Sequence, residues 1–207
     1  MGTACSLVVT AALAYTLSRK RLRGRQIILL LILITILFSP GIIPNYMLVR
    51  ELHLINNLWS LILPALASGW NVILMKNFFD SIPAELEESA SIDGCNDLSI
   101  FVRIILPLSL PSLAAFGLFY AVGYWNQFFN ALIYINDASK WPLQVLLQNI
   151  LLNANNADLR ADAVTVAPPT ETLKMAAVVV ATVPILLVYP FLQKHFAKGA
   201  MVGSVKG

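Results

Sequence analysis

A short polar stretch, residues 80–111, interrupts a chain that is otherwise mostly apolar. It holds the carboxylates Glu87, Glu88, Asp93 and Asp97, which accept charge-assisted hydrogen bonds when a basic partner approaches. By composition alone, such a stretch is most often an ordinary solvated loop. The order of its residues therefore has to decide between a docking surface and a loop of no special function.

Helix signals within this stretch predict two short helices joined at a glycine. Pro83 suits a first helical turn, and the acids after it favour the positive end of a helix over residues 83–93. Gly94 suits the left-handed residue that ends such a helix. Asp97 is the predicted N-cap of a second helix, whose apolar stripe is Leu98, Phe101, Val102 and Ile105. Two short helices at an angle form a knob that suits docking.

Catalytic and metal-binding arrangements are not expected in this chain. His53 and His195 have no carboxylates at a useful spacing, so we interpret both as surface residues. An intramembrane protease, the enzyme class considered, would need a motif such as His-Glu-x-x-His or Gly-x-Ser-Gly, which the sequence lacks. We therefore predict no catalytic residue, no metal and no cofactor.

The elements that must position the polar stretch are those of a membrane protein. Hydrophobic residues make up 58% of the 207, and charged residues 12%, against roughly 25% in soluble domains. A helix of about 20 apolar residues crosses a bilayer. We predict one all-α domain, residues 1–207, a polytopic bundle with about five transmembrane helices at 3–17, 27–49, 54–75, 112–135 and 173–193.

Basic residues predict the orientation of this bundle. The segment 19–25 carries five of them and no acid, and positive loops stay in the cytoplasm. Alternation then places residues 80–111 and the C-terminus in the cytoplasm and residues 136–172 outside. This bias accounts for the net charge of +3 without nucleic acid as a partner. A helix over 142–152 is expected in the external loop, which is either a surface for a substrate-delivering binding protein or a flexible connection.

The polar stretch resembles the EAA signature of ABC importer permeases, Glu-Ala-Ala-x3-Gly-x9-Ile-x-Leu-Pro. Here it reads Glu88-Ser89-Ala90, Gly94 and Ile104-Ile105-Leu106-Pro107, with Ser89 as the one departure. "SIPAELEESASIDG", "RIILPLSLP", "FYAVGYWNQFFNALIYI", "WPLQVLL" and "GSVKG" resemble the carbohydrate-uptake branch, which is MalG-like, and in particular its LplC/YtcP-like members. The resemblance covers residues 3–207.

This resemblance implies a function for residues 80–111, called the coupling loop below. In the family the loop inserts into a cleft on an ATP-binding subunit, here through Glu88, Ser89, Ala90, Asp93, Gly94, Ile104, Leu106 and Pro107. Because the sequence has no Gly-x4-Gly-Lys-Ser/Thr loop, ATP and Mg²⁺ would be bound by that partner. The family also implies a second, different permease subunit, a solute-binding protein and the bacterial cell membrane.

Two further expectations concern the number of helices and the substrate. Family members have six transmembrane helices, so an N-terminal helix is expected to be missing, and a truncated, non-transporting fragment or scaffold is the alternative. A carbohydrate path is predicted where polar and aromatic residues meet in one span. Its candidates are Gly123, Tyr124, Trp125, Asn126, Gln127 and Asn130. Interfacial aromatic belts and amides that join helices give the same pattern.

Overall fold

The computed structural model describes residues 1–159, 172 and 174–187. Within them there is no strand, which confirms the all-α prediction. Residues 160–171 of the predicted external loop, residues 188–193 of the last predicted span, His195 and the C-terminal "GSVKG" lie outside the described residues. The helices are α1 (Gly2–Ser18), α2 (Arg25–Leu37), α3 (Ile42–Glu51), α4 (Trp59–Ile62), α5 (Gly69–Asp80), α6 (Ala84–Ile92), α7 (Asp97–Ile100), α8 (Leu106–Leu108), α9 (Leu110–Trp125), α10 (Phe129–Tyr134), α11 (Leu143–Leu159) and the helix Lys174–Leu187.

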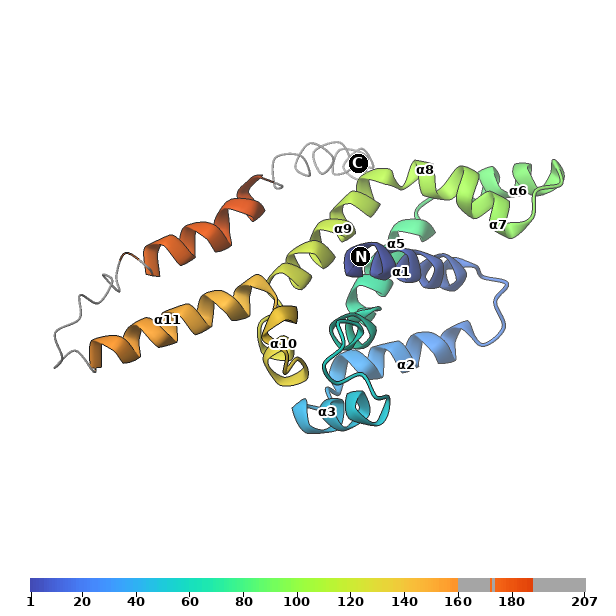
Figure 1. The fold of residues 1–207 in the computed structure, drawn as a ribbon. Helices are drawn as coiled ribbons and strands as arrows, with labels where there is room; N and C mark the ends of the chain where they lie inside the picture. The colour runs from blue at the N-terminus through green and yellow to red at the C-terminus, as the bar shows by residue number, and fades with distance from the viewer. Residues whose placement is uncertain (160–171, 173, 188–207) are drawn as a thin grey trace.

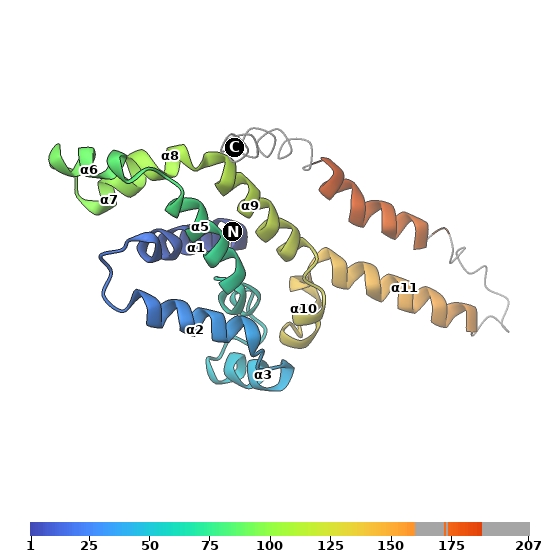
Figure 2. The same cartoon turned by 180° about the vertical axis from the view of Figure 1, so that it is seen from behind.

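Three further short turns connect these helices. They are the 3₁₀ turns η1 (Leu63–Ala65) and η3 (Ala138–Lys140) and the π-helical turn η2 (Phe101–Ile105). The central helices are α1, α5 and α9, with α1 packed against both others. Figure 1 shows α6, α7 and α8 at one end of the molecule and α3 at the opposite end, while α11 extends away from the rest. The helix Lys174–Leu187 contacts α9 through Trp125. The view from behind shows the same arrangement (Figure 2).

Membrane-length helices are broken in this structure. Within the described ranges, no single helix is both long and apolar enough to cross a bilayer, but three bent pairs are, by length and composition. Their bend angles are 117° between α2 and α3, 52° between the α4–η1 segment and α5, and 83° between residues 97–108 and α9. The predicted number and bounds of the spans therefore remain a prediction: 3–17 coincides with the single helix α1, whereas 27–49, 54–75 and 112–135 are each divided between helices.

Local sequence explains where the first of these breaks falls. The predicted span 27–49 divides between α2 and α3, where Pro40 lacks a backbone donor and Gly41 has φ +84°. The predicted span 112–135 divides between α9 and α10, at residues 126–128. Close approach also depends on a glycine, because a Cβ on Gly69 of α5 would lie 2.9 Å from Ile36 of α2.

Buried apolar side chains form two clusters, one between α1, α5, α9 and the coupling loop and the other between α3, α4, α10 and α11. The loop-side cluster joins these three helices to the coupling loop through Ala11, Ala14, Tyr15, Met75, Phe79, Ala90, Ile100, Ile105 and Phe116. The far cluster joins α3, α4, α10 and α11 through Val49, Leu61, Ala131, Tyr134, Ile135 and Val145. The predicted helix 142–152 is confirmed as α11, which continues to Leu159.

We predict that Phe79→Ala destabilises the protein by about 3 to 5 kcal/mol, because a fully buried ring leaves a cavity when it is truncated. Phe79 is 1% exposed in the loop-side cluster. The melting temperature of the protein purified in detergent measures this loss. Phe129→Ala is the matched control, since Phe129 is 50% exposed. Equal melting temperatures for the two variants would contradict the assignment of Phe79 to the core.

Candidate functional site

The coupling loop folds as two short helices joined at a tight turn. The predicted helix 83–93 is confirmed as α6, which follows Pro83. Gly94 has φ +82°, the left-handed backbone that favours glycine, and its N–H donates to the Ser91 carbonyl at 3.1 Å. The Cys95 N–H closes the turn by donating to the Ala90 carbonyl at 3.0 Å.

Two details of the second helix differ from the sequence prediction. The N-cap is Asn96 and not Asp97, because the Asn96 side chain accepts a hydrogen bond from the Ser99 N–H at 2.8 Å. The predicted apolar stripe holds for Phe101 and Ile105, which pack in the loop-side cluster, but it is wrong for Leu98 and Val102, which are 70% and 51% exposed. The buried side chains are Ile100 and Ile105, five positions apart. That spacing follows from the π-helical turn η2, which shifts the face by one residue.

The structure divides the predicted coupling residues between an outer and an inner side. Glu88, Ser89, Asp93, Gly94 and Pro107 are exposed. Ala90 is buried in the loop-side cluster, so its small size lets α6 approach the rest of this chain. Ile104 and Leu106 are partly buried against the same cluster. The exposed group is therefore the part of the signature that a partner protein can reach.

Aromatic rings seat the coupling loop on the end of α1. The Tyr15 ring lies 4.7 Å from the Phe101 ring and 6.4 Å from the Phe79 ring, between centroids. The Tyr15 hydroxyl donates to the Asp97 carbonyl at 3.4 Å. One side chain of α1 thus contacts both α5 and the second half of the loop.

Ion pairs join the loop to the linker between α1 and α2, residues 19–24. Arg19 pairs with Glu87, and Arg21 pairs with Asp97. Burial lowers the pKa of Arg19, although the Tyr15 ring beneath it acts in the other direction. The sequence interpretation used these arginines only to predict topology. The acidic residues of the loop were the signal that could have predicted ion pairs with them.

A polar cavity of about 480 Å³ lies between α9 and the break that precedes α5. Four of the predicted path residues line it: Gly123, Tyr124, Gln127 and Asn130. Ser68, Asn71 and Tyr120 also line it and were missed. The lining has phenol, amide and hydroxyl groups, which suit a ligand rich in hydroxyls.

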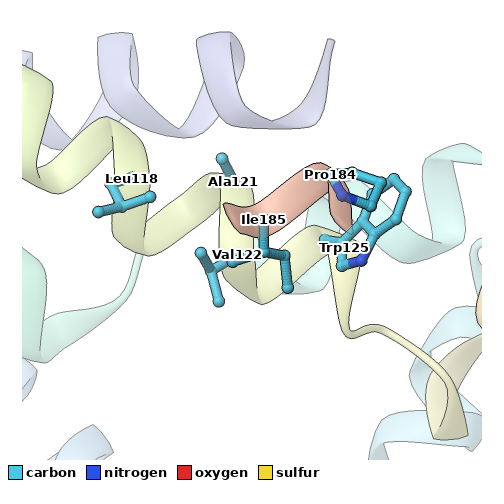
Figure 3. Close-up of a pocket in the computed structure, with 6 residues that line it drawn as sticks. All are labelled: Leu118, Ala121, Val122, Trp125, Pro184 and Ile185. Carbon is cyan, nitrogen blue, oxygen red and sulfur yellow. The ribbon is translucent and has the colours of Figure 1, made fainter. Parts of the chain in front are cut away.

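The structure does not bring Trp125 and Asn126 to this cavity. Trp125 lines a separate apolar hollow of about 180 Å³ with Pro184 and Ile185 (Figure 3), and its indole N–H donates to the Ala181 carbonyl at 3.0 Å. The exposed Asn126 amide donates to the Val122 carbonyl of its own helix at 3.0 Å. Both side chains therefore have partners within the chain, away from the cavity.

Hydroxyl pairs form a ladder between α1 and α9 beside the cavity. Thr10 and Tyr120 are joined at 2.6 Å between hydroxyl oxygens, and Ser6 and Tyr124 at 2.8 Å. The ladder also provides a hydrogen-bond acceptor for the break between α4 and α5, because the Tyr120 oxygen accepts a hydrogen bond from the Ser68 N–H at 3.2 Å. Serine and threonine in the first predicted span carried no motif, so nothing in the sequence alone pointed to them.

Gln127 satisfies another backbone group of the same break. Its amide donates to the Leu61 carbonyl at 3.0 Å. Inside a membrane, carbonyls freed by a helix break need such partners. The Gln127 amide therefore lines the cavity and also joins the end of α9 to α4.

At the other end of the molecule, the turn η3 is held by charged and polar contacts. Hydrogen bonds from the Ser139 side chain and backbone lower the pKa of the exposed Asp137. The Lys140 ammonium donates to the Asn56 carbonyl at 3.1 Å. These contacts fix the start of the predicted external segment to the loop before α4.

Comparison with known proteins places these features in one family. The model of the family described as "Binding-protein-dependent transport system inner membrane component" matches residues 6–202. The polygalacturonan/rhamnogalacturonan transport system permease protein YtcP of Bacillus subtilis (strain 168) is 53% identical over 209 residues, which is 100% of this chain and 73% of that protein. Protein LplC of the same organism is 52% identical over 211 residues, covering 100% and 70%.

A solved structure is also similar to this chain. It is the crystal structure of a bacterial ABC transporter involved in the import of the acidic polysaccharide alginate. The TM-score is 0.85 at 36% sequence identity, and the match covers 94% of this chain and 70% of that chain.

We predict that Tyr120→Phe destabilises the protein by about 1 to 3 kcal/mol, because it leaves the Thr10 hydroxyl and the Ser68 N–H without their partner. The melting temperature in detergent reports this effect. Tyr46→Phe is the control, as the Tyr46 hydroxyl makes no hydrogen bond within the described part of the chain and its ring only stacks on Tyr134. If both variants melt together, the ladder does not stabilise the break before α5.

Proposed function

We propose that the cargo of this chain is a sugar or an oligosaccharide. The chain belongs to the binding-protein-dependent transport system inner membrane components, and it is a permease subunit of an ABC importer. The cargo would cross by alternating access, in which rigid parts of the protein rock around the cavity. The names of the relatives, which refer to polygalacturonan, rhamnogalacturonan and alginate, support a carbohydrate.

The polar cavity supports the same substrate class. Its lining offers the ring of Tyr124 for stacking and the amides of Asn71, Gln127 and Asn130 for hydrogen bonds to hydroxyls, while Tyr120 is buried behind it. No charged side chain lines it among the described residues. We therefore propose Tyr124, Gln127 and Asn130 as contacts of the cargo, and we assign Trp125 and Asn126 to packing around the path.

The coupling loop is proposed to receive force from an ATP-binding subunit. The observation that carries this proposal is a preformed, exposed turn with the EAA spacing, in which Gly94 has φ +82° and open space around it. Glu88 and Asp93 present carboxylates beside this turn. Basic groups of a partner would bind them, and ATP and Mg²⁺ would stay on that partner, with no cofactor in this chain.

A continuous path connects the loop to the cavity. Residues 97–108 lead through Ser109 into α9, which carries Tyr120 and Tyr124 (Figure 1). Displacement of the loop would tilt α9 and change the access to the cavity. The function proposed for the loop thus has a mechanical route to the cargo.

The other partners are proposed from the family and from the end of the molecule opposite the loop. There the far cluster and the Lys140–Asn56 contact hold α10 and α11 in place, which supports a surface for a solute-binding protein. A second, different permease subunit would complete the path. The chain is an inner membrane component, and we propose that its C-terminus is cytoplasmic.

We predict that Gly94→Asp abolishes uptake and co-purification of an ATP-binding subunit while the protein remains inserted in the membrane. A Cβ at this position meets nothing within 4 Å, so the new side chain clashes with no described residue and only the φ of +82° adds backbone strain, whereas a carboxylate would project into the partner. The measurements are a mild-detergent pull-down and uptake of labelled polygalacturonan fragments.

Gly24→Asp is the matched control for this variant. Gly24 has φ +81° and the same open space, so a substitution there carries the same backbone strain but lies in the linker, outside residues 80–111. Normal association and uptake by Gly94→Asp would refute the docking role.

We predict that Asn130→Ala raises the substrate concentration for half-maximal uptake by about 3- to 10-fold, the range expected for one lost hydrogen bond. Asn126→Ala should change it far less, because Asn126 lies outside the cavity and bonds to its own helix. Kinetics of uptake of labelled polygalacturonan fragments compare the two. The reverse order of effects would place the path on the other side of α9.

A further inference from the structure

Three arginines at the start of the chain each reach a different part of the coupling loop. Arg25 lies 3.6 Å from Asp80 at the end of α5, measured from Nη2 to Oδ2. Arg19 pairs with Glu87 of α6, and Arg21 pairs with Asp97 at the start of α7. The linker therefore contacts both helices of the loop, and the first residue of α2 contacts its base.

Two of these pairs reach the helices of the loop, and of these two Arg19–Glu87 is much less exposed to solvent than Arg21–Asp97. Its side chains are 16% and 19% exposed, whereas those of Arg21 and Asp97 are 63% and 62% exposed. Exposed ion pairs contribute little, but removal of one partner from a mostly buried pair is costly. Arg19 is therefore the member of the linker whose loss should be felt most.

The orientation of Arg19 is set by the end of α1. Its guanidinium carbon lies 4.4 Å from the centroid of the Tyr15 ring, and its Nε donates to the Ser18 hydroxyl at 3.0 Å. The same Tyr15 ring contacts Phe101. Charge and packing thus attach the loop to α1 at one place.

Helix α1 meets the polar cavity farther along its length. Thr10 and Ser6 bond there to Tyr120 and Tyr124, two residues that line the cavity. A second route therefore runs from the loop through Arg19 and α1 to the cavity. The first route, along the backbone, passes the 83° bend at Ser109, where flexing could absorb a displacement.

We propose that Arg19 is a positioning residue for coupling, and that its ion pair with Glu87 makes α1 follow the coupling loop when the ATP-binding subunit moves the loop. This inference rests on the coupling function proposed above for residues 80–111. Without the pair, the loop would still bind its partner through its exposed side. Its movement would reach the cavity only through the bent joint.

The test uses the assembled importer in proteoliposomes, with Asn130→Cys as a reporter in the cavity and the free thiols Cys5 and Cys95 replaced by serine. The rate at which a charged, membrane-impermeant maleimide reacts with the reporter is measured with and without ATP, together with ATP hydrolysis. In the Arg19→Gln variant, we expect the ATP-dependent change in this rate to fall about tenfold, while hydrolysis and association continue.

Four companion variants make the test specific. Glu87→Gln should give the same loss, and the double variant should be no worse than either single one, because both remove one interaction. Arg19→Lys should restore part of the response, since it keeps the charge. Arg23→Gln should respond to ATP as strongly as the reporter protein that carries only Asn130→Cys and the two serine replacements. Arg23 is exposed in the same linker and has no ion pair among the described residues.

The possible results separate this inference from the function on which it rests. If no ATP-binding subunit assembles with the unmodified chain, the coupling function of the loop is wrong. If the reporter protein without an Arg19 substitution responds to ATP and the Arg19→Gln variant responds equally, the coupling function stands and the inference about Arg19 fails. A fall of hydrolysis and response in equal proportion would show only lost stability and would also overturn it.

Discussion

The structure depends on the burial of one side of the coupling loop against the ends of α1, α5 and α9. Ile100 and Ile105 face inward because the chain makes a π-helical turn between them, and Ala90 is small enough for α6 to lie flat on the same cluster. Tyr15 and Phe79 supply the opposing surface. One apolar side is thereby buried within the chain, while the carboxylates, the glycine turn and the exposed side chains of Ile92 and Leu98 face outward.

A second constraint, the need to satisfy backbone groups at a helix break, explains how a mostly apolar protein holds a polar cavity. Helices that break inside a membrane free backbone groups that need hydrogen-bond partners. Here the break before α5 is satisfied by Tyr120 of α9 and by Gln127, which follows α9. The side chains that repair the break are also those that line the cavity, so the break and the site form together. The 83° bend at Ser109 then connects this region to the loop.

Much of this arrangement follows from local sequence patterns. Pro83, the acids after it and Gly94 specify α6 and its end, because helix termini are determined by a few neighbouring residues. The EAA spacing leads to the family in the same way, through residues close in the chain. The second helix was predicted, but its apolar stripe was wrong at Leu98 and Val102 because a π-helical turn changes the repeat, and no residue type signals that turn.

The sequence by itself determined the membrane class, the helical content, the coupling loop and the kind of protein, since each depends on composition or on contacts between near neighbours. Tertiary structure alone decided that Arg19 pairs with Glu87, that Ser6 and Thr10 bond to tyrosines of α9, and that Asn130 but not Asn126 lines the cavity. These pairs join residues far apart in the chain. Which side chains meet across helices depends on the rotation and bending of each helix, and those are set by packing of the whole bundle.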